Sequence, residues 1–389
     1  MRRLGALALI ALAGFASDVV NPGKARMDPV RLKRIPARMQ KFVDDGTAAG
    51  FVTLIMRHGA IAELSATGWQ DREAKIPMRI DTIFQVMSMT KPMTATAVMI
   101  LAEEGLLSFN DPISKYLPEF ADQKLKDGSK PARPATLRDL ATHTSGMPGY
   151  PDGYNTQREH TLAEAVKTVS HLPLQFEPGS KWSYSNTGMA TLGRIVEVVS
   201  GLSYEKFMAE RIFLPLGMKD SFFFPTPDRY SRIAAVYTDE KGTLQPAHTD
   251  VFHKAAKYPA PEGGLYTTAA DLARFYQMML NHGTLDGHRI LSKAAIDTMV
   301  LNHTGELTAG FAPGMGYGFG WAVVRNTEGT FRLNSIGTYG HGGAYRTFGW
   351  VDPAKDMFGI LLFQRTNGGG DLADEITAFM TMAAAAIEE

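Results

Sequence analysis

Cysteine is absent from this chain of 389 residues, which excludes disulfides, thiolate metal sites and a cysteine nucleophile. An excess of charge is absent as well, since 40 Lys and Arg residues balance 40 Asp and Glu residues. A neutral chain is not expected to bind nucleic acid or an anionic membrane surface through its net charge, so a small molecule is the expected partner. With 44% hydrophobic residues the chain can bury a large core, and its length predicts two or three domains of ~150 residues each.

Long apolar runs are missing near the N-terminus, where the run at residues 4–15 has twelve residues, too few to span a bilayer. The run follows Arg2 and Arg3 and ends in a small-x-small sequence at Ala16. This pattern predicts a cleaved secretory signal at residues 1–16, and hence a periplasmic or secreted protein without stable membrane insertion. The alternative is a buried or amphipathic N-terminal helix in a cytoplasmic protein.

The order of predicted elements favours an α/β fold of the α+β kind. Strand patterns occur near both ends of the chain, while Pro- and Gly-punctuated helical patterns lie between them. We therefore predict one discontinuous α/β domain made of residues 17–87 and 255–389. A mainly helical domain at residues 88–254 is inserted into it, and the cleft between the two is the expected place for a site.

Several common catalytic signatures are missing: G-x-S-x-G, H-E-x-x-H, the P-loop and G-x-G-x-x-G. The nearest approach to a metal-ligand cluster is His248, Asp250 and His253, a grouping that polar loops also collect by chance. The sequence therefore predicts neither a metal nor a cofactor.

Two S-x-x-K motifs are present, and their surroundings differ. Residues three apart share a helix face, so Ser88 with Lys91 and Ser203 with Lys206 could each place an amine beside a hydroxyl. Pro92 requires its helix to begin near Ser88, which places this serine at the positive end of the helix dipole. Apolar neighbours are expected to bury Lys91, which favours a neutral amine able to act as a base. The second pair lies on an amphipathic surface helix, where Ser203 is expected to be an N-cap.

Two further segments have chemical character. Tyr184 and Asn186 lie two residues apart on a predicted loop that follows a Pro-Gly turn. His341, Gly342 and Gly343 precede a strand pattern, and their small neighbours allow a substrate to approach the backbone closely, as an oxyanion donor requires. Taken alone, each segment could equally be an ordinary turn.

Three of these motifs resemble those of the serine β-lactamase and penicillin-binding superfamily in their order and separations. They are Ser88-x-x-Lys91, Tyr184-x-Asn186 and His341-Gly342-Gly343. The similar branch contains class C β-lactamases, D-Ala-D-Ala carboxypeptidases and family VIII carboxylesterases, and the similarity extends from about residue 35 to 380. The resemblance implies a β-lactamase-like fold, an antiparallel sheet flanked by helices with an inserted helical domain. Further segments that fit this branch are residues 137–146, 178–188, 215–218 and 263–272.

The resemblance implies a role for each motif. Ser88 would be the nucleophile, and Lys91 with Tyr184 would serve as general base. A tyrosine has an ordinary pKa of ~10, so we expect Lys91 to lower the pKa of Tyr184 and the two to titrate as a coupled pair. The backbone N–H groups of Ser88 and Ala344 would form the oxyanion hole.

The same resemblance places substrate-binding residues. Asn186 would orient Lys91 or the acyl amide, although a structural role is equally compatible with its position. His341, Gly342 and Gly343 stand where class C β-lactamases carry Lys-Thr-Gly, so the motif offers a weaker, pH-dependent cation and no hydroxyl.

This departure favours the esterase branch. The sequence therefore predicts a serine hydrolase that cleaves short-chain carboxylic esters through an acyl-Ser88 intermediate. A class C-type β-lactamase or a D-Ala-D-Ala carboxypeptidase is the alternative with the same mechanism. A non-hydrolytic acyl-binding receptor is the alternative of another class, and Tyr184 argues against it because deacylation needs such a group. His143 is expected to be a structural hydrogen-bonding residue.

Overall fold

The computed structural model describes residues 20–154, 160–247, 249–250, 253–327, 332–367 and 370–388. The predicted signal at residues 1–16 and His248 lie outside the described residues, so cleavage after Ala16 stays a prediction. In the described part of the chain, no helix combines the length and apolar character that crossing a membrane requires.

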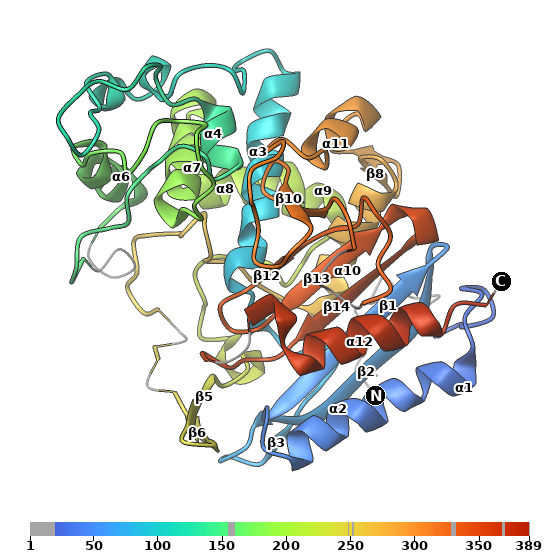
Figure 1. Ribbon diagram of the computed structural model, residues 1–389. Helices are drawn as coiled ribbons and strands as arrows, with labels where there is room; N and C mark the ends of the chain where they lie inside the picture. The colour runs from blue at the N-terminus through green and yellow to red at the C-terminus, as the bar shows by residue number, and fades with distance from the viewer. Residues whose placement is uncertain are drawn as a thin grey trace, which may run out of the picture.

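An antiparallel sheet of eight strands, in the order β10-β11-β12-β13-β14-β1-β2-β3, forms the centre of the fold (Figure 1). Strands from the two ends of the chain meet where β1 pairs with β14, with Val52 opposite Leu362. The predicted antiparallel sheet with flanking helices is thus confirmed. Its strands are β1 (Gly50–Arg57), β2 (Ala60–Asp71), β3 (Ile76–Pro77), β10 (Met315–Tyr317), β11 (Ala322–Val324), β12 (Tyr339–Gly342), β13 (Phe348–Asp352) and β14 (Met357–Leu362).

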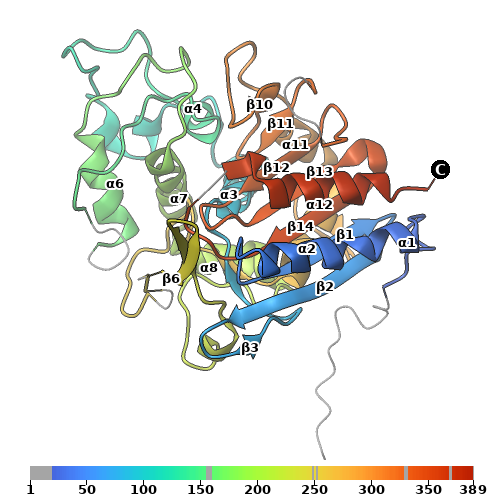
Figure 2. The same ribbon diagram turned by 60° about the horizontal axis from the view of Figure 1, so that its bottom comes forward.

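Helices cover both faces of this sheet. The terminal helices α2 and α12 pack against each other on one face (Figure 2), and α10 contacts β1 and β14 on the other. Strand β1 serves both cores because its side chains alternate: Phe51 and Ile55 join the core under α2 and α12, while Val52 and Leu54 join the larger core. The helices of this part are α1 (Pro29–Leu32), α2 (Arg34–Asp44), α10 (Ala269–Leu280), α11 (Lys293–Met299) and α12 (Asp374–Ala385).

The remaining helices form a second group, in which α3 packs against α7, and α7 against α4, α6 and α8. Local signals define their ends: Thr136 and Thr161 each form a capping box, and Gly201 ends α7 with a φ of 72°. These helices are α3 (Lys91–Glu103), α4 (Leu137–Ala141), α6 (Leu162–Ser170), α7 (Asn186–Ser200), α8 (Tyr204–Met208) and α9 (Leu214–Leu216). The short elements that bear on the site are β4 (Phe84–Gln85), η1 (Met87–Thr90), β7 (Tyr266–Thr267) and η7 (Gly370–Leu372), and the small hairpins are β5 (Tyr237–Glu240) with β6 (Thr243–Pro246) and β8 (Thr284–Leu285) with β9 (His288–Arg289).

The segment that follows α9 returns to the sheet. The N–H of Ala235 donates to the backbone oxygen of Gln70 at 3.0 Å, and the N–H of Tyr237 donates to that of Gln364 at 3.0 Å. This segment falls within the predicted helical insertion at 88–254, yet these hydrogen bonds connect it to the sheet side of the molecule. The exact domain boundaries stay a prediction.

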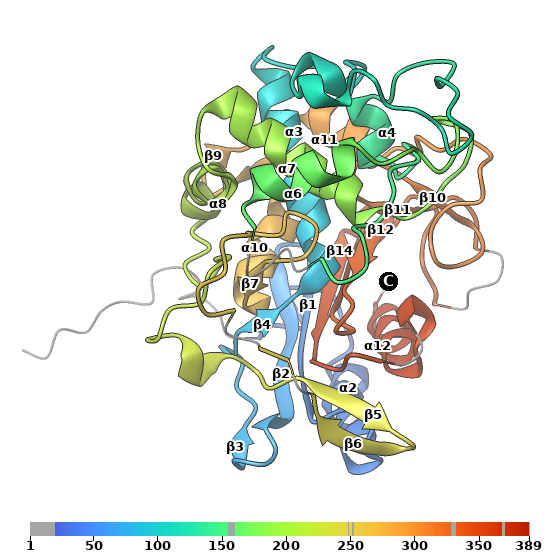
Figure 3. The same ribbon diagram turned by 90° about the vertical axis from the view of Figure 1, so that its left-hand side faces the viewer.

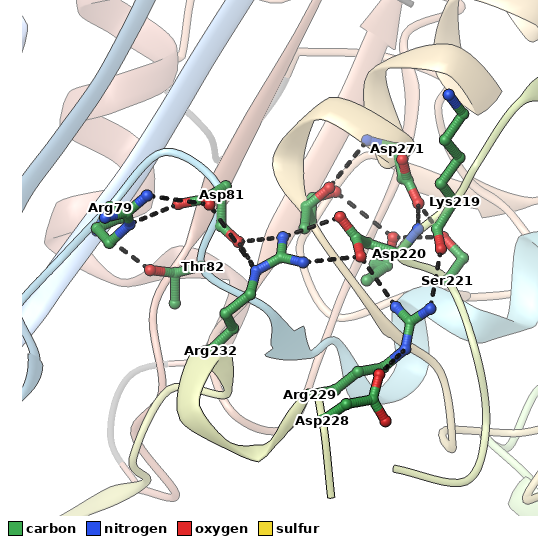
Figure 4. A network of polar contacts seen from close by, with 12 residues as sticks. Arg79, Asp81, Thr82, Lys219, Asp220, Ser221, Asp228, Arg229, Arg232 and Asp271 are labelled. Carbon is green, nitrogen blue, oxygen red and sulfur yellow. Dashed lines mark hydrogen bonds and ion pairs between the residues drawn. The ribbon is translucent and has the colours of Figure 1, made fainter. Parts of the chain in front are cut away.

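A network of charged side chains holds this segment next to the approach to β4 (Figure 4). Asp220 accepts hydrogen bonds from Arg229 and Arg232, and Arg232 also donates to the backbone oxygen of Asp81 at 2.7 Å. Asp271, near the start of α10, accepts from the N–H of Asp220 at 2.7 Å. The network therefore connects the start of α10 and the segment after α9 with Asp81, which precedes Ser88 by seven residues in the chain.

Candidate active site

Ser88 lies at the start of the most buried helix of the structure. Strand β4 pairs with β7, and the chain then turns through η1 into α3 (Figure 3). Met87 makes this turn with a φ of 49°, and Pro92 lies in the first turn of α3, as its chemistry requires. Ser88 is partly exposed and lies in the first turn of η1, where a backbone N–H has no partner within the helix.

Lys91 is completely buried beside this serine. Its Nζ lies 2.9 Å from Ser88 Oγ and donates to the backbone oxygen of Glu262 at 2.6 Å. Burial lowers the pKa of Lys91 to about 7, although the negative charge of Glu262 opposes this shift. The sequence interpretation of Lys91 as a buried amine, neutral near physiological pH, agrees with this geometry.

Tyr184 completes the contacts of Ser88, but its electrostatics differ from the expectation. The Tyr184 hydroxyl hydrogen-bonds to Ser88, and Lys91 Nζ lies 4.6 Å from the centre of its ring. Burial raises the pKa of Tyr184 well above its ordinary value, and the bond with Ser88 offsets this only in part. The prediction of a lowered pKa is wrong because burial of the Tyr184 hydroxyl dominates, and the charges of Asp371 and Glu262 raise its pKa further. Tyr184 is therefore a protonated phenol over the physiological range.

His341 lies on β12 and is buried. Its Nδ1 lies 2.6 Å from the backbone oxygen of Gly342, which can only accept, so Nδ1 carries the proton. Nε2 then accepts from the Tyr317 hydroxyl at 2.8 Å. Burial, together with the nearby amine of Lys91, lowers the pKa of His341 to about 3. The expectation of a pH-dependent cation in this motif is wrong, since the imidazole is neutral over the physiological range.

The Gly-Gly sequence of this motif allows two backbones to approach closely. A Cβ on Gly343 would lie 2.4 Å from the backbone oxygen of Val86 and 2.3 Å from Thr347 Oγ1, so no side chain fits there. The turn closes through a hydrogen bond from the N–H of Gly343 to the backbone oxygen of Thr347 at 2.7 Å, which leaves the N–H of Ala344 out of that bond. The third motif is thereby held against the backbone of Val86, which lies two residues before Ser88 in the chain.

Asn186 is the first residue of α7, and its side chain is exposed. Lys91 Nζ donates to Ser88 Oγ and to the backbone oxygen of Glu262, and no described contact connects it with Asn186. Orientation of Lys91 by Asn186 is therefore not seen, while contact of Asn186 with an acyl amide stays a prediction.

His143 has the structural character expected of it. The residue is buried, and its Nδ1 accepts from the N–H of Ser185 at 3.2 Å. Ser185 in turn caps α7, because its Oγ accepts from the N–H of Gly188 at 3.0 Å. The centres of the His143 and Tyr184 rings lie 4.5 Å apart, so His143 packs against the tyrosine.

The second S-x-x-K pair and the His-Asp grouping near residue 250 do not form a site in the described part of the chain. Ser203 occupies the N-cap position of α8, but its hydroxyl donates to Glu205 at 2.5 Å, and Lys206 is an exposed residue 3.8 Å from a carboxylate. His253 lies 3.1 Å from the side-chain nitrogen of Gln85. Within the described ranges, no group of three or more His, Cys, Asp or Glu side chains is placed to hold a metal ion.

Glu262 is the site residue that the motifs did not reveal. Its backbone oxygen holds Lys91, and both carboxylate oxygens accept from the Tyr258 hydroxyl at 3.0 Å. Burial raises the pKa of Glu262 to about 7, while the nearby amine and the bond from Tyr258 act against the shift. The available signal was an acidic residue between Pro261 and Gly263 in an otherwise apolar, glycine-rich segment.

The sheet with its helical half, and the serine and buried lysine at the start of α3, define a serine hydrolase of the β-lactamase and penicillin-binding type. The chain belongs to the family described as Beta-lactamase, whose model matches residues 35–379.

Three similar proteins illustrate the range of this family. Esterase EstB of Burkholderia gladioli is 30% identical over 364 residues, which cover 85% of this chain and 89% of the esterase. Penicillin-binding protein 4 of Amycolatopsis lactamdurans is 32% identical over 324 residues, which cover 82% of this chain and 81% of that protein. The solved structure of EstCE1, described as a hydrolase with promiscuous acyltransferase activity, superposes with a TM-score of 0.80 at 26% identity, covering 92% of this chain and 99% of that one. EstB and EstCE1 fit the esterase-like branch to which the motifs pointed.

Proposed function

We propose that the protein hydrolyses short-chain carboxylic esters through an acyl-Ser88 intermediate. The observation that carries the proposal is a neutral amine, Lys91, 2.9 Å from Ser88 Oγ, next to a third motif whose His341 supplies no charge. The similarity to EstB and EstCE1 supports an ester as the substrate.

The geometry supports a two-step reaction. In acylation, Lys91 Nζ takes the proton of Ser88 as Oγ attacks the ester carbonyl. The backbone N–H groups of Ser88 and Ala344 donate to the developing oxyanion. The protonated Tyr184 hydroxyl then gives its proton to the leaving alkoxide and recovers one from Lys91, so the alcohol departs neutral. In deacylation, water loses a proton to the same pair and attacks the acyl carbon. The pair returns that proton to Ser88 Oγ as the acyl–oxygen bond breaks, which releases the carboxylic acid and restores the serine hydroxyl.

A panel of substrates tests the proposal. We expect p-nitrophenyl butyrate to be hydrolysed with a kcat/KM at least about 100-fold above that for nitrocefin or a D-Ala-D-Ala peptide, because neither Lys91 nor His341 supplies a fixed positive charge for the carboxylate of either. Initial rates on the three substrates under one set of conditions provide the measurement. A dominant rate on nitrocefin or the peptide would instead support the β-lactamase or carboxypeptidase alternative. A stable acyl adduct without turnover, observed by intact-protein mass spectrometry, would support the acyl-binding receptor.

The pH dependence follows from the buried amine. Since Lys91 must be neutral to accept the serine proton, we expect kcat/KM for a neutral ester to rise as pH increases through about 7 and then to level off. Glu262 titrates in the same range and shares the proton with Lys91, so the rise of kcat/KM near pH 7 reports the titration of the pair. His143 and His341 do not contribute, because burial lowers the pKa of each well below this range. A limb near pH 4–5 would contradict the assignment of the base to Lys91.

A further inference from the structure

Two carboxylates that the proposed mechanism does not use lie near Tyr184. Glu262 is on the Lys91 side, since its own backbone oxygen holds the amine. Asp371, in η7, lies against Gly342, where a Cβ would be only 2.1 Å from its Oδ1. Both carboxylates interact electrostatically with Tyr184 and raise the pKa of its hydroxyl. Both residues are partly exposed. Burial raises the pKa of Glu262 to about 7 and that of Asp371 to about 6, so a substrate bound at the site would experience both charges above about pH 7.

Glu262 is fixed in place by a buried network. Tyr258 is buried and donates to both carboxylate oxygens, and its hydroxyl lies 2.9 Å from that of Tyr150. The backbone before the glutamate is held too, because Thr94 Oγ1 donates to the backbone oxygen of Pro261 at 2.6 Å. The bond from Tyr258 opposes the rise that burial causes in the pKa of Glu262, and the network holds the carboxylate at a defined position.

When Lys91 is neutral, as its role as a base requires, the nearby cations offset the charge of Asp371 but not that of Glu262. Lys91 must be neutral to act as a base, and His143 and His341 are neutral because they are buried. Arg332 is buried and donates to the backbone oxygen of Asp371, so its charge offsets that of Asp371. Above about pH 7 both Lys91 and Glu262 have released their protons, so the charge of Glu262 then lacks a compensating cation.

We propose that Glu262 and Asp371 are specificity-determining residues that select against substrates carrying a carboxylate near the scissile carbonyl and favour neutral or cationic esters. The inference rests on the proposed ester hydrolysis and adds the charge class of the substrate. Like charges held a few ångströms apart in a partly buried site repel strongly enough to change a rate about tenfold or more. Glu262 is expected to contribute more than Asp371, because Arg332 offsets only the latter.

Charge-matched esters test this selection. The probes are phenyl butyrates that differ only in a meta substituent: an amide, a carboxylate or a trimethylammonium group. The quantity measured is the ratio of kcat/KM between the carboxylate and amide esters at about pH 8 and low salt, because screening at high salt would weaken the effect. A ratio within one variant cancels losses caused by partial misfolding. The variants are Glu262→Gln and Asp371→Asn, with Glu210→Gln as a matched control, since Glu210 is exposed and pairs only loosely with a lysine at 3.8 Å.

We expect wild type to prefer the amide over the carboxylate ester by at least about 30-fold, and the cationic ester to react at least as fast as the amide. Glu262→Gln should reduce this preference about tenfold, Asp371→Asn about threefold, and Glu210→Gln by less than about twofold. Equal rates on the anionic and neutral esters in wild type, or an unchanged ratio in both site variants, would overturn the charge selection while leaving ester hydrolysis in place. Absence of turnover on all three esters would overturn the proposed function instead. The rate at which amide- and carboxylate-bearing phosphonates label Ser88, followed by intact mass, would then still decide the charge selection.

Discussion

Replacing Ser88 with alanine is expected to reduce kcat/KM for p-nitrophenyl butyrate by about 10⁴-fold or more, which leaves only a trace of activity. The hydroxyl is the atom that Lys91 Nζ approaches at 2.9 Å and to which Tyr184 hydrogen-bonds, so we expect it to be the group that forms the acyl intermediate. Because the side chain is small and partly exposed, the variant should fold like wild type. Initial rates, together with a thermal unfolding curve for each protein, check both expectations.

Ser203→Ala is the matched control for this experiment. It removes the hydroxyl of the other S-x-x-K motif, which donates to Glu205 on the surface. Its activity should stay within about twofold of wild type, because surface substitutions away from a site change little. Substantial hydrolysis by Ser88→Ala, with an acyl adduct on another residue, would show that the nucleophile is wrongly assigned.

The local elements of this fold could be predicted from the sequence because each has a short-range cause. The turn at His58 and Gly59 joins β1 and β2, which pair with each other directly across it. The capping boxes at Thr136 and Thr161, each formed between residues three apart, start α4 and α6. The neighbour of β1 across the sheet could not be found this way. Its pairing with β14 joins residues about 300 apart in the chain, and no local pattern specifies such a partner.

The same distinction holds for the site. Ser88 and Lys91 come together through helix geometry, and the apolar flanks were enough to predict that the lysine is buried. The state of Tyr184 was not predictable, since it depends on desolvation by groups from several segments. Glu262 was missed for a related reason: it reaches Lys91 across a sequence separation of 171 residues. Contacts of this kind determine which residues hold protons and charge, and only the assembled structure reveals them.

Replacing Lys91 with methionine should separate activity from stability. Methionine has a similar length and suits the apolar surroundings, but it cannot accept the serine proton, so kcat/KM for a neutral ester should fall by about 10³-fold or more. The free energy of unfolding should rise by about 1–3 kcal/mol near neutral pH, because wild type buries an amine that water would otherwise solvate. The lost hydrogen bond to the backbone oxygen of Glu262 limits this gain.

The pH dependence of this stability gain gives it a signature of its own. The native pKa of Lys91 is about 7, below the ordinary value of 10.5 that applies in the unfolded chain. Between these values the unfolded state binds more protons than the native state, so the stability of wild type rises with pH and its deficit relative to Lys91→Met shrinks as pH approaches 10.5. Lys206→Met is the matched control, because that lysine is exposed and its replacement should alter neither activity nor stability appreciably. Chemical unfolding of the three proteins at about pH 7 and pH 9 measures the difference. A Lys91→Met variant that keeps activity within about tenfold of wild type, or that is less stable at both pH values, would show that the buried amine is a structural group and not the base.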